Sequence, residues 1–167
     1  MIQKETDISD QQIIDWIGQP ANRDQGFRLL VEKYQERLYW QIRNRVLTHE
    51  NTDDVLQNCL IKIYKGLPNF KGDSQLFTWM YRIASNESIS FLRKNKKHQS
   101  TSIDDAENNI ENELSADGYF DGDKAQIALY KAVATLPEKQ KEVFRMRYFD
   151  EMAYTQMSEL TGTSEGG

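Results

Sequence analysis

The sequence predicts an all-α protein: two small helical domains joined by an acidic flexible linker, the second domain being an incomplete helix-turn-helix. In both halves apolar residues recur at steps of three and four, the period of a helix with one buried face. Neither half contains a convincing alternation of apolar and polar residues, so no strand is expected. An acidic stretch without such a period, residues 99–123, lies between the halves. We therefore expect domains at residues 1–98 and 124–167.

The first domain should begin with a short helix. Ser9, with Gln12 three residues later, has the pattern of a capping box, and Gly18 and Pro20 should end the helix. A long helix is predicted next, because seven apolar residues share one stripe along it. They are Phe27, Leu30, Val31, Tyr34, Leu38, Ile42 and Val46. We expect this stripe to form the core.

A third helix is predicted to open at Asp53 and Asp54, whose charge suits the positive end of the helix dipole. It should end near Lys65, before Gly66 and Pro68. One side of this helix is apolar throughout. Its residues are Val55, Leu56, Cys59, Leu60, Ile63 and Leu67.

The opposite side of the third helix is polar, except for Ile61. A single exposed apolar residue is common and needs no explanation. Alternatively, Ile61 anchors a docking face whose register is set by Asp54, Gln57 and Asn58. Both interpretations remain open at this point.

A fourth helix, from about Leu76 to Arg93, should carry a face that core packing does not explain. Arg82, Asn86 and Arg93 fall on the side away from its apolar stripe, with Trp79 at the edge. Arginine contacts phosphates, asparagine pairs with base edges, and aromatic rings stack on unpaired bases. The face could therefore hold single-stranded DNA. Alternatively, the aromatic residues belong to the core or its boundary, and the arginines form a solvated face.

The loop before this helix is the right length to wall a pocket, although similar loops occur without a ligand. Its residues are Phe70, Lys71, Gly72, Asp73 and Ser74.

Eight acidic residues and no Lys or Arg occupy the predicted linker. Without these eight acids the formal net charge of −5 would become +3, so a cationic surface coexists with an acidic tether. The segment also lacks a sustained apolar period, which favours flexibility.

In the second domain an apolar stripe predicts a helix that ends at Leu136-Pro137. The stripe consists of Ala125, Ala128, Leu129, Ala132, Val133 and Leu136. Pro137 suits the first turn of a following helix, which would carry Val143, Phe144 and Tyr148. A short helix through Tyr154, Met157, Ser158 and Leu160 should stop at Gly162. These are the first parts of a helix-turn-helix.

Several classes of function are not favoured. No window approaches the roughly 18 apolar residues of a membrane span, and the N-terminus lacks a signal core, so we expect a cytoplasmic protein without membrane insertion. Cys59 is the only cysteine, and His49 and His98 are isolated, so neither a disulfide nor a metal site is expected. We expect no cofactor and no enzymatic activity, because no nucleophile, base and stabiliser form a recognisable set.

The first half resembles extracytoplasmic-function sigma factors of the sigma-70 family. Asp53-Asp54-Val55-Leu56-Gln57, with Leu60, Lys62 and Tyr64, is similar to the family helix that docks on the clamp coiled coil of the largest polymerase subunit. The polymerase-binding residues implied by this resemblance are Asp53, Asp54, Gln57, Asn58 and Ile61. Asn58 stands where the family often has Glu.

The segment from Phe70 to Asn86 resembles the family segment that opens the minus-ten element. The DNA-binding residues implied there are Phe70, Lys71, Ser74, Gln75, Trp79, Arg82, Asn86 and Arg93. By this resemblance Phe70, Ser74 and Gln75 line a pocket for a flipped non-template base, and Asn86 contacts that base.

The second half resembles the promoter-reading domain of the same family, in Leu136-Pro137, Arg147-Tyr148, Tyr154 and Gly162. Met157-Ser158 departs from the Ile-Ala that is frequent there. The helix that should read the minus-thirty-five element would begin near Ser164, and only its first residues are present. We expect a natural chain that continues past Gly167.

The resemblance implies a sigma factor that binds core RNA polymerase and directs promoter recognition, melting and transcription initiation. Promoter DNA would be its second partner, and an anti-sigma factor that covers the same faces is common in the family. Two alternatives stay open. A helix-turn-helix regulator acting without polymerase would leave the docking face unexplained, and a helical adaptor module would leave the arginine stripe unexplained.

Overall fold

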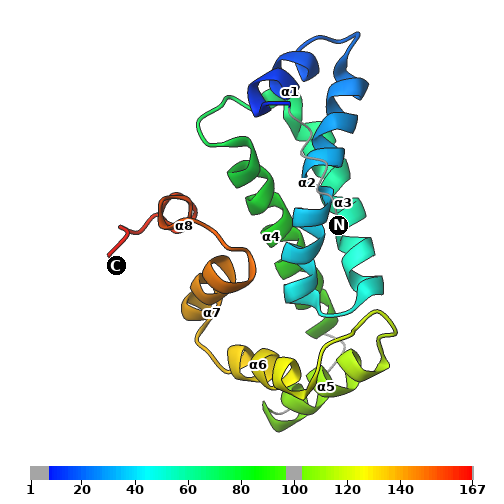
Figure 1. Cartoon of the computed structure of the whole chain (residues 1–167), viewed down its shortest axis with the longest axis vertical. Coiled ribbons are helices and arrows are strands. Elements are labelled where there is room, and N and C mark those ends of the chain that lie inside the picture. The colour runs from blue at the N-terminus through cyan, green and yellow to red at the C-terminus, as the bar shows by residue number, and fades with distance from the viewer. Residues whose placement is uncertain (1–7, 97–102, 167) are drawn as a thin grey trace.

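The computed structural model describes residues 8–96 and 103–166, and the side chains of residues 103–108 lie outside the description. Lys97, His98 and the beginning of the predicted linker lie outside the described residues. The regular structure in the described part is helical throughout (Figure 1), which confirms the predicted all-α class. Its elements are α1 (Asp10–Ile17), α2 (Arg23–Val46), α3 (His49–Gly66), η1 (Leu67–Asn69), α4 (Leu76–Lys96), α5 (Ile103–Ala116), α6 (Lys124–Ala134), α7 (Glu138–Phe144), η2 (Arg145–Phe149) and α8 (Tyr154–Thr161).

Helices α1 to α4 pack around the apolar stripe that the sequence predicts. The capping box at Ser9 is formed, because its hydroxyl accepts from the backbone N–H of Gln12. Leu30, Leu38 and Ile42 of α2 are fully buried. The core of the first half is therefore a mainly apolar seam between α2 and its neighbours.

Helix α3 begins at His49, so the predicted start at Asp53 is wrong. The Thr48 hydroxyl caps the helix by accepting from the backbone N–H of Asn51, and a hydroxyl at the N-cap satisfies a donor that a charge one turn later does not. Leu47, with a φ of 70°, turns the chain between α2 and α3. Helix α4 extends to Lys96, slightly beyond the predicted Arg93.

The segment predicted as a flexible linker contains a helix, α5. Leu114 is buried, Ile110 is half-buried, and α5 packs along α6. A few apolar residues at helical spacing thus suffice when a partner helix covers them. The described part of the linker without helical structure is residues 117–123.

The apolar stripe predicted for α6 is mostly exposed. Val133 is buried, but Leu129 is 40% exposed, and the alanines of the stripe face solvent. The physical reason is that, within the described residues, α6 packs mainly against α5 and less against α7. The predicted end of α8 at Gly162 is confirmed, and this glycine takes the left-handed conformation with a φ of 68°.

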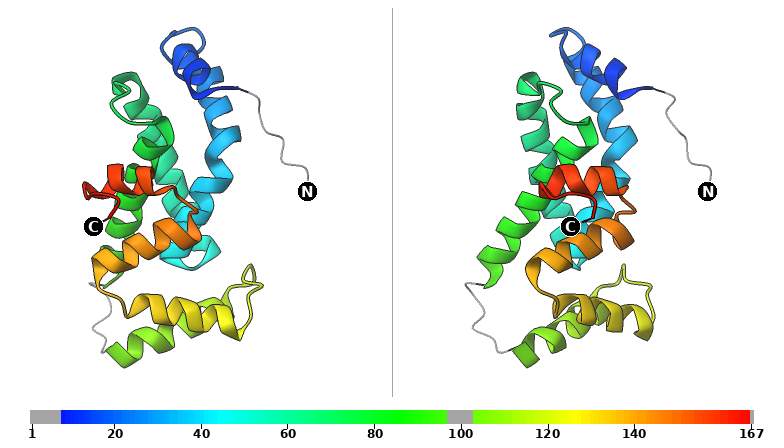
Figure 2. Two further views of the ribbon diagram at one scale, coloured as in Figure 1. Left: turned by 60° about the vertical axis from the view of Figure 1, so that its left-hand side comes forward. Right: turned by 90° about the vertical axis from the view of Figure 1, so that its left-hand side faces the viewer.

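The end of the chain returns to the first half. Figure 2 shows α8 lying across α4, and α8 also contacts η2, which packs on α2. Met146, Met152 and Met157 join the same apolar cluster as the core of α1 to α4. None of the described helices is both long enough and apolar enough to span a bilayer.

Candidate nucleic-acid interface

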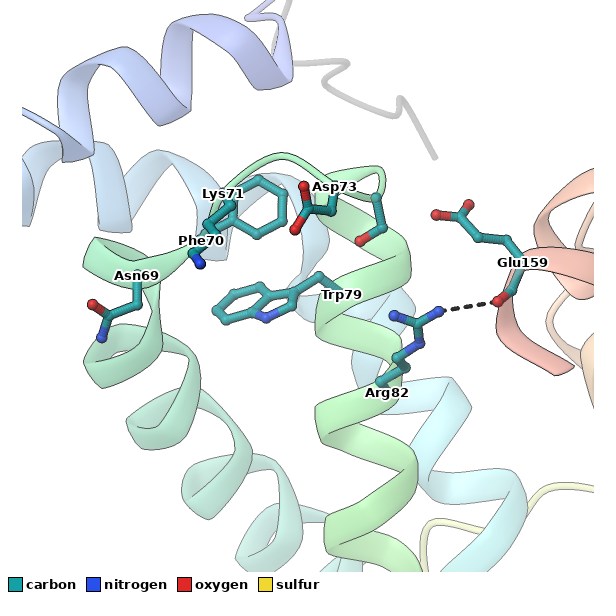
Figure 3. A pocket seen from close by; sticks show the side chains of 8 residues that line it. Asn69, Phe70, Lys71, Asp73, Trp79, Arg82 and Glu159 are labelled. Carbon is teal, nitrogen blue, oxygen red and sulfur yellow. Dashed lines mark hydrogen bonds between the residues drawn. The ribbon is translucent and has the colours of Figure 1, made fainter. Parts of the chain in front are cut away.

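A cavity of about 320 Å³ opens between the loop after η1 and the start of α4 (Figure 3). Its walls are Asn69, Phe70, Lys71, Asp73, Ser74, Trp79, Arg82 and Glu159. Five of the residues predicted to bind minus-ten DNA are among them. These are Phe70, Lys71, Ser74, Trp79 and Arg82.

Two aromatic rings form one wall of the cavity. The Phe70 and Trp79 ring centroids are 5.2 Å apart at an interplanar angle of 49°, and Figure 3 shows the indole beside the opening. Gly66 makes room for this arrangement, since a Cβ there would lie 2.9 Å from Trp79 Cζ2. The rings offer an apolar surface on which a flat ligand could stack.

Charged side chains surround the rings. Lys71 and Arg82 supply positive charge, and Asp73 supplies a carboxylate. A cation can neutralise a phosphate, while a carboxylate can accept a hydrogen bond from an exocyclic amino group. Stacking surface, cations and an acceptor together suit an unpaired nucleotide.

The aromatic residues of α4 differ in burial. Phe77 and Tyr81 are buried in the core, and Phe77 stacks on Tyr34 with centroids 5.5 Å apart. Trp79, by contrast, is only partly buried and lines the cavity.

The remaining predicted residues of α4 lie outside the cavity. Asn86 and Arg93 are exposed further along the helix and do not line it. Gln75 is exposed next to Ser74, and its Oε1 accepts a hydrogen bond from Gln156 Nε2 at 3.3 Å. Ser164 is exposed beyond the end of α8, away from the cavity walls.

The predicted docking face of α3 is exposed as a whole. Asp53, Asp54, Gln57 and Asn58 face solvent, and Ile61 among them is 46% exposed. Asp53 Oδ2 lies 3.2 Å from His49 Nε2 one turn earlier.

Cys59, on the other side of α3, is fully buried, and burial raises the pKa of its thiol to about 12. This cysteine is therefore a protonated core residue.

Sequence reasoning missed the contribution of α8 to the cavity. Arg82 Nη2 donates to the backbone carbonyl of Glu159 at 3.0 Å, across 77 positions of sequence. A backbone carbonyl carries no sequence signal, so no motif could have indicated this contact. Asn69 lies in the predicted loop and also lines the cavity, although it was not among the predicted binding residues.

Comparison with known proteins identifies the family of the chain. The family model for Sigma-70 region 2 matches residues 30–98, and that for Sigma-70, region 4 matches residues 126–167. The RNA polymerase sigma-H factor of Pseudomonas aeruginosa is 29% identical over 157 residues, covering 89% of this chain and 80% of the relative. The ECF RNA polymerase sigma-E factor of Escherichia coli is 26% identical over 161 residues, covering 92% and 83%.

A solved structure shares the fold. CnrH, solved in complex with the cytosolic domain of CnrY, superimposes with a TM-score of 0.66 at 16% identity, over 94% of this chain and 85% of that one. The two family models together span most of the chain, and the relatives align along nearly all of it. The chain therefore belongs to the sigma-70 family, as an extracytoplasmic-function sigma factor that serves RNA polymerase in promoter recognition.

Proposed function

We propose that the cavity between Phe70 and Arg82 captures a flipped base of the minus-ten element. The observation that carries this proposal is the pair of rings, Phe70 and Trp79, beside the cations Lys71 and Arg82. A flipped base is held by stacking and by hydrogen bonds to its edge, and these side chains supply both. Binding energy, rather than covalent catalysis, would then drive promoter melting.

The exposed side of α4 would guide the single strand that leaves the cavity. Asn86 and Arg93 lie on this side beyond Arg82, and Ile89 between them is partly exposed. The two arginines can each contact a phosphate of the strand, and Asn86 can pair with a base edge outside the cavity.

The exposed face of α3 would dock on polymerase. Ile61 would be its apolar anchor, surrounded by Asp53, Asp54, Gln57 and Asn58 as polar contacts. A central apolar residue with a polar rim is the usual arrangement of an energetically important contact. Polymerase and DNA would thus use different helices of the same half.

We assign the two functions to two domains, residues 1–98 for polymerase and minus-ten DNA and residues 124–167 for the upstream element, where Ser164 would begin the reading helix. Residues 99–123 would connect them. CnrH is bound to the cytosolic domain of another protein in its solved structure, and we include an anti-sigma factor among the partners.

The variant Asn86→Ala tests the assignment. We expect promoter opening by the reconstituted holoenzyme to fall about tenfold, because one base-edge contact is worth about 1–3 kcal/mol. Polymerase binding should stay unchanged. Ser90→Ala, one turn further along α4 and also exposed, is the matched control and should leave both measurements unchanged.

Ile61→Ala should have the reverse effect: weaker polymerase binding in a pull-down, and normal promoter opening once polymerase is saturated. If either variant lost polymerase binding and promoter opening equally, the faces of α3 and α4 would be assigned wrongly. A wild-type chain that fails to bind core polymerase would overturn the docking proposal.

A further inference from the structure

Lys62 belongs to the α3 motif that resembles the docking helix of the family, but it is not part of the docking face assigned above. Its partner lies on α4, because its ammonium forms an ion pair with the carboxylate of Glu87. The Lys62 side chain is 59% exposed, and the Glu87 side chain is 15% exposed. The pair therefore joins the helices proposed to bind polymerase and DNA, with its lysine open to solvent.

This ion pair lies over the core between α3 and α4. Cys59, on the turn of α3 before Lys62, is fully buried. Burial raises the pKa of its thiol, the Glu87 carboxylate raises it further, and the Lys62 ammonium lowers it, so both charges are close to the thiol. Ser88, which follows Glu87, is also fully buried. Packed side chains thus fix the backbone on both sides of the pair.

The same seam between α3 and α4 begins at the cavity. Gly66 at the end of α3 faces Trp79 of α4, since a Cβ at Gly66 would lie 2.9 Å from Trp79 Cζ2. Figure 3 shows the indole extending from α4 toward η1, which follows α3 directly. From Trp79 to Glu87 the seam runs about 12 Å along α4, at about 1.5 Å per residue. Helix α3 therefore borders the proposed path of the strand from the cavity to Asn86.

A strand whose base contacts Asn86 would pass directly beside the Glu87 carboxylate, because the two residues are neighbours on α4. A carboxylate repels a phosphate, whereas an ammonium attracts it. An exposed lysine is worth little to stability in an ion pair, so its ammonium can exchange a carboxylate for a phosphate at small cost. Each such phosphate contact also releases counterions from the DNA.

We propose that Lys62 binds a phosphate of the captured single strand beside Asn86, and that Glu87 is a positioning residue that holds the ammonium there before the strand arrives. This inference rests on the proposed function of the exposed side of α4. Helix α3 then contacts polymerase through Ile61 and DNA through Lys62, the next residue along the helix.

The first experiment measures the salt dependence of strand binding by the reconstituted holoenzyme at saturating polymerase. The probe is a fluorescein-labelled single-stranded DNA that the wild-type holoenzyme selects from a random pool. Lys62→Met keeps the apolar stem and removes the charge. It should weaken binding about threefold and reduce the slope of log affinity against log salt by about 0.7, which corresponds to one phosphate of a single strand. Lys62→Arg should restore the slope.

Lys65→Met is the matched control. It removes the same charge from an exposed position one turn later on α3, and we expect it to leave the slope unchanged. A pull-down with core polymerase verifies that each variant still docks, so that the slope reports DNA alone.

The second experiment separates a DNA contact from a purely structural ion pair. Glu87→Gln removes the like charge beside the phosphate and frees the ammonium, so strand binding should strengthen about twofold while the slope stays that of the wild type. A pair that only joined the two helices would give a different result. Lys62→Met and Glu87→Gln would then both lower the melting temperature and both weaken strand binding, with the wild-type slope.

The two proposals fail separately. A wild-type slope in Lys62→Met, an equal loss of slope in Lys65→Met, or weaker binding in Glu87→Gln overturns the phosphate contact of Lys62, even when Asn86→Ala impairs capture of the strand. Equal strand binding with and without Asn86→Ala overturns the assignment of the capture face, while the slope in Lys62→Met still reports whether α3 contacts a phosphate.

Discussion

The two halves of the molecule are held by different forces. Helices α1 to α4 enclose a core of fully buried aliphatic side chains such as Leu30, Leu38 and Ile42. The second half buries few apolar residues and meets the first half largely through ion pairs and hydrogen bonds. The shape of the first half therefore follows from its own apolar core, whereas the position of the second half depends largely on charged partners that water can replace.

The largest expected effect comes from emptying the core of the first half. Ile42→Ala should lower the free energy of unfolding by about 4 kcal/mol, because a fully buried side chain leaves a cavity behind. Denaturant unfolding measures this change in the free energy of unfolding. Leu129→Ala on the exposed stripe of α6 should change the same quantity by less than about 0.5 kcal/mol. Similar changes in the free energy of unfolding for both variants would show that the two halves do not differ in this way.

The next largest effect should come from the charged contact between the two halves. Arg45→Leu removes the cation that Glu142 and Asp150 share, although Glu142 keeps its ion pair with Arg145. Breaking one side of a buried pair costs about 3 kcal/mol. We expect this cost to fall on the contact between the two halves: amide hydrogen exchange should accelerate in α8 and stay slow in α2. Equal acceleration in both helices would show that the halves unfold as one unit.

A smaller effect should follow from Tyr130→Phe. This change leaves the buried Asn44 Oδ1 without its donor, which costs about 1.5 kcal/mol. Thermal unfolding provides the measurement. Tyr119→Phe removes the same atom from a side chain that is 71% exposed, so its melting temperature should equal that of the parent.

The smallest effect should be a pH step from Asp117. Burial raises the pKa of this carboxyl, but hydrogen bonds from the N–H groups of Tyr119 and His49 and the charge of Arg43 outweigh it, so the pKa lies below the ordinary 3.8. The stabilisation is therefore complete above that value and is lost as the pH falls through the lowered pKa. Thermal unfolding at a series of acid pH values measures this step. Asp117→Asn should make the step smaller but not abolish it, because Arg45 also lowers the pKa of Glu142.

Local signals predicted much of the first half correctly. The capping box at Ser9 and the stripe of α2 depend on neighbours within a few turns, and both are confirmed. The predicted start of α3 at Asp53 is wrong, because the hydroxyl of Thr48 caps the helix one turn before the acidic pair. Five cavity residues were predicted because they come from one continuous segment and its helix.

Long-range polar contacts could not be predicted. Arg45 lies next to an apolar stripe position, and a charged residue there is expected in solvent; its partner Glu142 is 97 positions away. Periodicity indicates which side of a helix is buried, but not which distant residue covers it. The helix α5 was missed for the same reason, since its few apolar residues become significant only with α6 in place.

Gly66 constrains the shape of the cavity from outside its walls. The residue is not among the cavity walls, yet any side chain there would displace the Trp79 indole, whose Cζ2 would be 2.9 Å away. A substitution at a position outside the cavity would therefore move one of its walls. Related chains could therefore differ in the shape of the cavity while every residue that we propose to contact DNA stays the same.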